Sequence, residues 1–491
     1  MQAPFYVMHT RRQFELGGCF TVLLLFLVML GLVFPQTLHA ATTASRPNVV
    51  FILADDLGYM DIGANNPKSF YETPNIDGLA RTGMRFTAGY SACAVCSPTR
   101  ASIMTGKYPQ RVGITDYIGR NRPDKMLPAP NADHLALEEI TIAERLRDAG
   151  YTNFFAGKWH LGGGQYGPGA QGFSPELVSP GQFFYPKTEQ PPDRINDGKT
   201  TDRIADEAIR FIDANKDRPF FAYLPFQAVH IPILAKPELI RKYEQKKSSA
   251  PPDAWGHDRN SDIRLVQNHA GYSAMIEQMD SAIGRVLAAL DRNGLSERTI
   301  VIFTSDNGGL ATAEGHPTAN LPLRAGKGWP YEGGVRVAWI VRAPGVTKPG
   351  SVCESPVIST DFYATMLDLT GQSTKLAPKD SMSLKPLLRG RKLNRGPLYW
   401  HYPHYGNQGG APYGAIRDGN WKLIEWYEDG KLELFNLRED LGERIDIASQ
   451  QPKLVAKLHT KLKAWRSDVK AVMPTPNPNP PSPYFTPAKK S

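Results

Sequence analysis

The sequence predicts an α/β fold with a mostly parallel sheet, because strand-like and helix-like segments alternate along most of the chain. Residues 48–53 and 299–304 are short apolar runs, as expected of strands buried on both faces of a sheet. Residues 270–290 carry apolar side chains at helical spacing and end just before the second of these runs. This order places parallel strands side by side, with helices covering the sheet.

Further elements continue the alternation between these two strands. Residues 141–149 read as a helix that begins with a Thr-x-x-Glu capping box and ends before a glycine. Residues 151–156 and 220–226 are apolar strands, and residues 202–214 place apolar side chains on one helical face. The repeated strand–helix unit supports the α/β prediction.

A different pattern near the C-terminus predicts a small antiparallel sheet that carries one helix. Residues 421–427 and 431–435 read as two strands joined by a Glu-Asp-Gly turn. Pro452 then opens a helix with apolar residues along one side. Beyond residues 1–41, we divide the chain into an α/β domain (42–395), an antiparallel α+β subdomain (396–473) and a Pro-rich tail (474–491).

The first 41 residues (1–41) have the layout of a secretory signal peptide. Arg11 and Arg12 precede an apolar stretch at residues 20–34, and small residues follow it. A bilayer span needs about 20 residues, so the stretch is short for one, although an uncleaved anchor is the alternative. The residues around the two arginines resemble a twin-arginine export signal. We therefore expect a periplasmic or extracellular protein that meets a membrane only during export.

Composition narrows the function classes. The net charge of +9 serves either solubility or the attraction of a polyanionic substrate. No run of Lys and Arg marks a nucleic-acid arm, so no nucleic-acid partner is expected. Of the four cysteines Cys19 would leave with the signal peptide, and the rest are too few for a disulfide scaffold. The absence of an Asn-x-Ser/Thr site favours a bacterial source.

Two pairs of oxygen-bearing side chains directly follow predicted strands. Asp55-Asp56 come after the first strand and Asp306-Asn307 after the last. The carboxyl ends of parallel strands meet at one edge of a sheet, so the two pairs are expected to converge. Carboxylate and amide oxygens suit Ca²⁺ or Mg²⁺. Taken singly, the first pair also fits a helix cap and the second a β-turn.

The segment that starts at Cys96 reads as the beginning of a short helix. Pro98 suits its first turn and Gly106 its end. Cys96 would then lie at the positive end of the helix, where free amides favour an anion, with Arg100 one turn further on. Taken alone, Cys96 would more commonly be a buried structural cysteine.

Basic side chains follow two more predicted strands. Lys158 and His160 are two residues apart, so a locally extended chain points both to the same side. His230 follows the strand at 220–226. Each histidine by itself also fits a structural role in a core. As a set, these groups are placed to converge on Cys96.

The segments together resemble the signature motifs of the type I, formylglycine-dependent sulfatases, over nearly the whole mature chain. The resemblance is closest to the arylsulfatase A and N-acetylgalactosamine-sulfatase branch. It implies an alkaline-phosphatase-like fold and the hydrolysis of sulfuric esters. The motifs occur in the family's order: Asp55-Asp56-Leu57-Gly58, Cys96-Ser97-Pro98-Thr99-Arg100, Gly157-Lys158-Trp159-His160, His230, Asp306-Asn307-Gly308 and Gly326-Lys327-Gly328.

The resemblance also implies two groups that the chain must acquire. A separate maturation enzyme would oxidise Cys96 to formylglycine (3-oxoalanine), whose hydrate is the nucleophile. One Ca²⁺ would be held by the modified residue together with Asp55, Asp56, Asp306 and Asn307. A serine nucleophile has no second hydroxyl and would need water to displace the sulfate, which is the physical reason for the modification.

Roles for the remaining residues follow from the same resemblance. Arg100 and the cation favour ionisation of one hydroxyl of the hydrate. Lys158 and Lys327 offset charge on the sulfuryl oxygens. His230 and Lys327 assist the departing alcohol, and His160 removes a proton from the second hydroxyl so that sulfate is eliminated.

The expected substrate is a sulfated carbohydrate, or an aryl sulfate as an artificial substrate. Residues 400–405 are rich in aromatic and histidine side chains, and a Gly-rich stretch follows at 406–410. Such a segment suits stacking on a sugar, and it suits interdomain packing equally. A phosphonate or phosphodiester hydrolase of the same superfamily and a catalytically silent polyanion-binding protein are the alternatives.

Overall fold

The computed structural model describes residues 46–119, 122–178 and 199–481. The predicted signal peptide at residues 1–41 lies outside the described residues, as does the end of the Pro-rich tail from 482 onward. None of the helices in the described ranges is long and apolar enough to cross a membrane.

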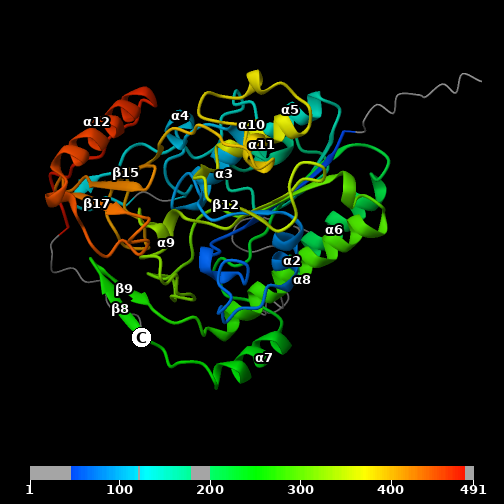
Figure 1. Cartoon of the computed structure of the whole chain (residues 1–491), viewed down its shortest axis with the longest axis horizontal. Coiled ribbons are helices and arrows are strands. Elements are labelled where there is room, and N and C mark those ends of the chain that lie inside the picture. The colour runs from blue at the N-terminus through cyan, green and yellow to red at the C-terminus, as the bar shows by residue number, and fades with distance from the viewer. Residues whose placement is uncertain (1–45, 120–121, 179–198, 482–491) are drawn as a thin grey trace, which may run out of the picture. The chain divides into compact units, whose positions relative to one another are not determined.

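An eight-stranded mixed sheet organises the chain from Arg46 onward (Figure 1). One strand, β11, runs antiparallel to both of its neighbours, and the other pairs are parallel. The predicted α/β class with a mostly parallel sheet is therefore confirmed. In spatial order the strands are β12 (Ser351–Cys353), β2 (Met84–Phe86), β11 (Trp339–Arg342), β10 (Thr299–Ser305), β1 (Asn48–Ala54), β7 (Phe220–Pro225), β5 (Thr152–Gly157) and β6 (Glu176–Val178).

The strand β1 lies inside this sheet, and all of its residues are buried. Because side chains alternate along a strand, Val50 and Ile52 enter one core while Val49 and Phe51 enter the other. A strand with both faces covered needs apolar residues at every position, which explains the continuous run in the sequence.

Helices cover both faces of the sheet (Figure 1). One core lies under α2 (Pro74–Thr82), α6 (Lys199–Ala214), α7 (Pro237–Lys247) and α8 (Ala270–Arg292). The opposite core lies under α3 (Cys96–Thr105), α5 (Ile142–Asp148), α10 (Asp361–Leu369) and α11 (Lys385–Leu388).

The helix α5 begins as its sequence predicts. The Thr141 hydroxyl accepts a hydrogen bond from the backbone N–H of Glu144 at 3.1 Å, and the Glu144 carboxylate accepts one from Thr141 N–H at 2.9 Å. This capping box satisfies two backbone donors that have no partner within the helix. Gly150, with φ of 86°, follows the C-terminus in the left-handed region that glycine adopts without strain.

The C-terminal region forms a four-stranded antiparallel sheet with one helix packed on it. Its apolar residues share a core with the α/β domain, rich in aromatic side chains. The Trp400 indole N–H donates to the backbone oxygen of Ser91 at 2.9 Å and fixes one contact between the two parts. The elements are β14 (Leu398–Tyr402), β15 (Tyr413–Asp418), β16 (Trp421–Trp426), β17 (Leu432–Asn436) and α12 (Pro452–Asp468).

Short elements complete the described chain. The first residues of the Pro-rich tail are extended and pair antiparallel with a segment near residue 126. The paired strands are β3 (Gly89–Tyr90) with β13 (Val357–Ile358), β8 (Trp255–Asp258) with β9 (Ser261–Arg264), and β4 (Met126–Leu127) with β18 (Thr475–Pro476). The remaining α-helices are α4 (Pro109–Val112) and α9 (Glu332–Val335). Single turns of 3-10 helix lie at Tyr59–Asp61, Gly164–Tyr166, Pro168–Gln171, Ser296–Arg298, Thr374–Leu376 and Ala448–Gln450.

Candidate active site

The carboxyl ends of four neighbouring parallel strands, β10, β1, β7 and β5, supply most of the predicted site. Loops that follow parallel strands meet at one edge of the sheet, so side chains far apart in the sequence come together there. These side chains are Asp306 and Asn307 after β10, Asp55 and Asp56 after β1, His230 after β7, and Lys158 and His160 after β5.

Cys96 is the first residue of α3, so the N-terminal end of this helix faces the same edge. The ligand atoms of Cys96, Asp55 and Asp306 lie within 4.8 Å of one another. Burial is the main cause that raises the pKa of the Cys96 thiol to about 11, although nearby lysine charges oppose it. An unmodified thiol at this position is therefore neutral at neutral pH and a weak nucleophile.

Arg100, one turn along α3, is a buried cation that ties the helix to the carboxylates. Its side chain is 1% exposed. The guanidinium pairs with Asp306 Oδ2 at 2.7 Å and approaches Asp55 Oδ2 at 3.5 Å. Its Nη1 donates to the backbone oxygen of Lys158 at 2.7 Å. A buried guanidinium with two carboxylate partners is fixed in position as well as compensated in charge.

Four oxygen-bearing residues, Asp55, Asp56, Asp306 and Asn307, are fully buried beside one another. The Asn307 amide donates to Asp56 Oδ1 at 2.8 Å, and the backbone N–H of Asp56 donates to Asp306 Oδ1 at 3.2 Å. Asp56 has a φ of 64°, a conformation that costs free energy in a non-glycine residue and often marks a functional site.

This oxygen set fits a hard cation. Asp55 Oδ1 and Asn307 Oδ1 are buried and accept no hydrogen bond from any described residue, so each has lone pairs available to an ion. Oxygen ligands of this kind suit Ca²⁺. His230 also lies within 4.8 Å of the Asp55 and Asp56 oxygens. An imidazole suits softer metals than Ca²⁺, and His230 also lines the pocket.

Two lysines approach the carboxylates from the side of the pocket. Lys158 Nζ lies 2.6 Å from Asp55 Oδ2, and Lys327 Nζ lies 2.8 Å from Asp56 Oδ2. Burial by itself would raise the pKa of Asp55, but the charges of Lys158 and Arg100 outweigh it and lower that pKa. Asp306 behaves differently, because burial and the neighbouring Asp55 charge raise its pKa.

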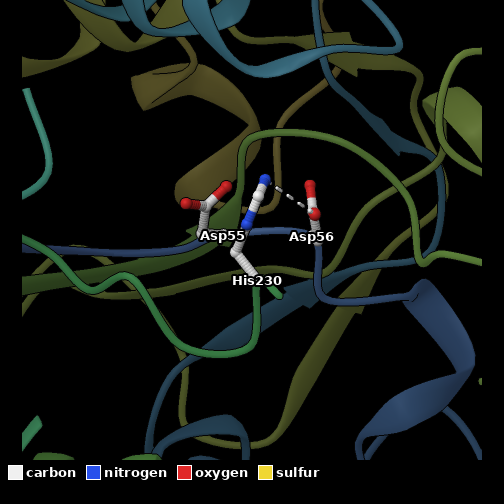
Figure 2. A group of neighbouring side chains, drawn as sticks. All are labelled: Asp55, Asp56 and His230. Atoms are coloured by element: carbon white, nitrogen blue, oxygen red, sulfur yellow. Dashed lines mark ion pairs between the residues drawn. The ribbon is translucent and has the colours of Figure 1, made fainter. Parts of the chain in front are cut away.

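The ring of His230 lies beside the side chains of Asp55 and Asp56 (Figure 2). Its Nε2 is 3.6 Å from Asp56 Oδ2, and its Nδ1 is 2.6 Å from the backbone oxygen of Ile231. A carbonyl oxygen only accepts, so Nδ1 carries a proton and Nε2 faces the site. Burial and the charge of Lys327 lower the pKa of His230.

His160 also lines the pocket. Its Nε2 lies 3.3 Å from the backbone oxygen of Ile118, so Nε2 is the protonated nitrogen. Its Nδ1 is buried, with no hydrogen-bond partner in the part of the chain that the structure describes. Burial, with the charge of Lys158, holds the pKa of His160 well below its usual value. The neutral ring can therefore accept a proton at Nδ1.

A pocket of about 830 Å³ opens onto this edge of the sheet. It is lined by Cys96, Lys158, His160, His230 and Lys327. The remaining predicted residues are buried behind this floor: Asp55, Asp56, Arg100, Asp306 and Asn307. The structure thus brings every sequence-predicted site residue to one place.

The sequence did not predict four residues that form the pocket wall above this floor. Tyr117, Glu314, Asn407 and Gln408 line the pocket, although they come from three separate loops. The Gly-rich stretch at 406–410 was the one signal that pointed toward two of them, and no motif marked the other two.

Between the two interpretations of residues 400–405, the structure supports packing. Trp400, His401, Tyr402, His404 and Tyr405 are all buried and none of them lines the pocket. Their side chains serve the contact between the C-terminal sheet and the α/β domain, as the Trp400 bond to Ser91 illustrates. Stacking of these rings on a sugar is therefore ruled out in this conformation.

Comparisons with known proteins agree with this geometry. The family model "Sulfatase" matches residues 47–372, and the model "N-sulphoglucosamine sulphohydrolase, C-terminal" matches residues 325–468. A protein named "Sulfatase" from Formosa agariphila is 32% identical over 89% of this chain and 93% of its own length. The N-acetylgalactosamine-6-sulfatase of Mus musculus is 32% identical over 85% of this chain and 78% of its own.

A solved structure extends the agreement to three dimensions. The crystal structure of Ps i-CgsB in complex with k-i-k-neocarrahexaose superposes with a TM-score of 0.71 and 27% identity, covering 86% of this chain and 93% of the other. The family match spans the strands and loops that supply the site. This chain belongs to the sulfatase family and is a hydrolase of sulfate esters.

Proposed function

We propose that this enzyme removes sulfate from a carbohydrate, using one Ca²⁺ and a formylglycine made from Cys96. The observation that carries the proposal is the position of Cys96, which lies at the N-terminus of α3 within 4.8 Å of the Asp55 and Asp306 ligand atoms. A buried neutral thiol in that place is a poor nucleophile but a well-placed precursor of one.

The two acquired groups supply what the side chains lack. Hydrated formylglycine offers two hydroxyl groups on one carbon, and Ca²⁺ offers a positive charge beside them. Residues that would hold the ion are Asp55, Asp56, Asp306, Asn307 and the modified residue 96. Arg100 keeps Asp306 and Asp55 in place and adds a fixed positive charge behind the nucleophile.

The lysines bind the sulfuryl group. Lys158 and Lys327 line the pocket, and both ammonium groups already lie at its floor. As negative charge shifts onto the sulfuryl oxygens and the leaving oxygen, two cations at close range stabilise that charge more than water does. For this, both lysines must turn from their carboxylate partners toward the ester. The bound Ca²⁺ would then balance the negative charges of Asp55 and Asp56.

The two histidines move protons at opposite stages. His230 Nε2 faces the site. In the doubly protonated ring, which the charge of Asp56 favours, Nε2 donates a proton to the departing alcohol with Lys327 beside it. His160 Nδ1, which is buried and unpaired among the described residues, accepts a proton from the second hydroxyl of residue 96. Loss of that proton would let the sulfate leave and the aldehyde form again, which is the chemistry that hydrated formylglycine would supply.

A carbohydrate is the substrate class we favour. A protein of the same fold at 27% identity was crystallised with k-i-k-neocarrahexaose, and a relative at 32% identity is named for the 6-sulfate of a sugar. The pocket of about 830 Å³ carries the polar side chains of Glu314, Asn407 and Gln408 above the charged floor, and such groups can hydrogen-bond to a sugar.

Mass spectrometry of the peptide that contains residue 96 tests the proposal directly. We expect a peptide lighter than the cysteine form, since oxidation to the aldehyde exchanges sulfur and two hydrogens for one oxygen. Cys96→Ala should lower turnover of every sulfate ester at least about 10⁴-fold, because no nucleophile remains. Cys353→Ala, at a half-buried cysteine outside the pocket, is the matched control and should retain activity.

Each alternative has its own signature. If expression with a maturation enzyme leaves Cys96 unmodified while activity is full, the mechanism is wrong. Faster hydrolysis of an aryl phosphonate or phosphodiester than of the matched aryl sulfate would favour that class of hydrolase. Binding of sulfated polysaccharide without turnover would favour the silent binding protein.

We also propose export to the periplasm or beyond the cell. The support is the signal-like sequence at residues 1–41, which lies outside the described residues. A twin-arginine route carries folded proteins, so the maturation enzyme would act on Cys96 in the cytoplasm. Unmodified Cys96 in a cytoplasmic pool, with modification only in the exported pool, would contradict this order.

A further inference from the structure

A series of hydrogen bonds runs along one wall of the pocket, through Tyr117, Asn407, Glu314 and Gln408. The Tyr117 hydroxyl donates to Asn407 Oδ1 at 3.4 Å, and the Asn407 amide donates to Glu314 Oε1. The same carboxylate oxygen accepts from Gln408 Nε2 at 2.9 Å. All four side chains line the pocket whose floor holds Cys96.

Glu314 fixes the orientation of both amides. A carboxylate only accepts hydrogen bonds, so the amide nitrogens of Asn407 and Gln408 turn toward it and their oxygens turn away. Gln408 is 1% exposed, yet its Oε1 accepts no hydrogen bond within the described ranges, and the same holds for Glu314 Oε2. Both oxygens are buried, and buried polar atoms normally have partners, so this wall holds two acceptors that lack a donor among the described residues.

The wall is rigid and lies next to the sulfate-binding floor. The backbone oxygen of Gln408 accepts from the Trp329 indole at 2.8 Å and from the Thr312 hydroxyl at 2.9 Å. A Cβ on Gly328 would lie 2.9 Å from Gln408 Cβ, so Gln408 packs closely against the residue that follows Lys327. A sugar whose sulfate reaches Lys327 therefore places its neighbouring ring substituents against this wall.

We propose that Glu314 and Gln408 select sugars with a hydroxyl or N–H group beside the sulfate ester and exclude sugars with a second sulfate or a carboxylate there. The inference rests on the proposed function and narrows its substrate class. A donor group satisfies the unused acceptors, and the site penalises a ligand that lacks it. A second anion brings no donor and meets the Glu314 charge. Two other charged residues line the pocket, Arg122 and Asp133. Their charges have opposite signs, so together they add no net charge to the pocket walls.

The test compares selectivity in wild type and Glu314→Gln, a change that removes the charge and keeps the size. Three esters are assayed for kcat/KM: an aryl sulfate, a monosulfated N-acetylhexosamine with a free neighbouring hydroxyl, and the same sugar with that hydroxyl sulfated. In the variant, the ratio of monosulfated sugar to aryl sulfate should fall at least about tenfold. The ratio of disulfated to monosulfated sugar should rise at least about tenfold.

A rise in the second ratio cannot come from poor folding, because misfolding lowers all rates together. Gln408→Leu, which removes the other acceptor, should lower the first ratio in the same direction. Glu439→Gln makes the same charge change at an exposed position away from the pocket, and both ratios should stay at wild-type values. Unchanged ratios in Glu314→Gln would overturn the selective role while leaving the sulfatase function intact. A wild type that cleaves none of the three esters would overturn the proposed function and this inference with it.

Discussion

The floor and the upper wall of the pocket are built in different ways. The floor is charged and comes from loops after adjacent parallel strands, so Asp55 after β1 and Asp306 after β10 are neighbours by sheet geometry alone. The wall is mostly uncharged and combines Glu314 with Asn407 and Gln408, which the C-terminal subdomain brings in. The difference separates the proposed reaction centre, which the eight-stranded sheet positions, from the proposed recognition surface, which depends on the packing of the C-terminal sheet.

Loss of a lysine charge at the floor should have the largest effect on activity. Lys327→Met and Lys158→Met each remove one charge that stabilises the sulfuryl oxygens, and we expect kcat/KM to fall about 10²- to 10³-fold. Because the floor acts on the sulfate itself, the loss should be equal for aryl and sugar sulfates. Kinetics on both ester classes check this equality.

Lys457→Met is the control for these variants, since Lys457 lies exposed on α12. Its rates should match those of the wild type. If Lys327→Met slowed sugar sulfates alone, the boundary between floor and wall would be wrong, because Lys327 would then recognise the sugar instead of the ester.

Ca²⁺ should stabilise the floor and leave the wall unaffected. Binding to the folded state alone adds about 2.7 kcal/mol to the free energy of unfolding when Ca²⁺ is at about 100-fold its Kd. We expect chelation to lower Tm and added Ca²⁺ to restore it, as followed by differential scanning fluorimetry. Asp306→Asn should weaken this response, because a neutral amide replaces one charged ligand.

Glu314→Gln, a change in the wall, is the comparison for Asp306→Asn in the same assay. Its Ca²⁺-dependent change in Tm should equal that of the wild type, because Glu314 does not belong to the oxygen set at the floor. An equal loss of the response in Asp306→Asn and Glu314→Gln would show that one ion site spans both regions.

The same division explains how far the sequence could predict the molecule. Apolar runs predicted the strands, and a Thr-x-x-Glu signal predicted the start of α5, because both patterns act over a few residues. Asp55 and Asp306 could be placed together because they directly follow strands. The positive φ values of Asp56 and His160 had no local signal, since surrounding contacts impose them.

The wall escaped prediction because its position depends on long-range contacts. Gln408 is fixed by bonds from Trp329 and Thr312, about 80 to 100 positions earlier in the chain, and no short pattern encodes such a contact. The aromatic residues at 400–405 were ambiguous for a related reason. Whether a ring stacks on a ligand or packs in a core depends on what covers it, and here the α/β domain does.

A smaller effect concerns Asp116, which lies beside the wall. Its Oδ1 accepts from the Tyr402 hydroxyl at 2.7 Å and from the backbone N–H of Tyr117 at 2.8 Å. Burial is the main cause that raises the pKa of Asp116 from 3.8 to about 7. The folded protein thus holds this proton more tightly than the unfolded chain does. Asp116 therefore lowers the free energy of unfolding progressively as pH rises from near 4 to about 7.

Asp116→Asn keeps an oxygen that can accept both hydrogen bonds but removes the titration. Relative to the wild type, the variant should gain stability between about pH 5 and about pH 8, by an amount on the order of 2 kcal/mol. Melting temperatures of both proteins at the two pH values measure the gain. Asp217→Asn, at an exposed position, should show no such dependence. A constant difference between wild type and Asp116→Asn would mean that Asp116 is ionised throughout, and that a buried negative charge beside Tyr117 is tolerated.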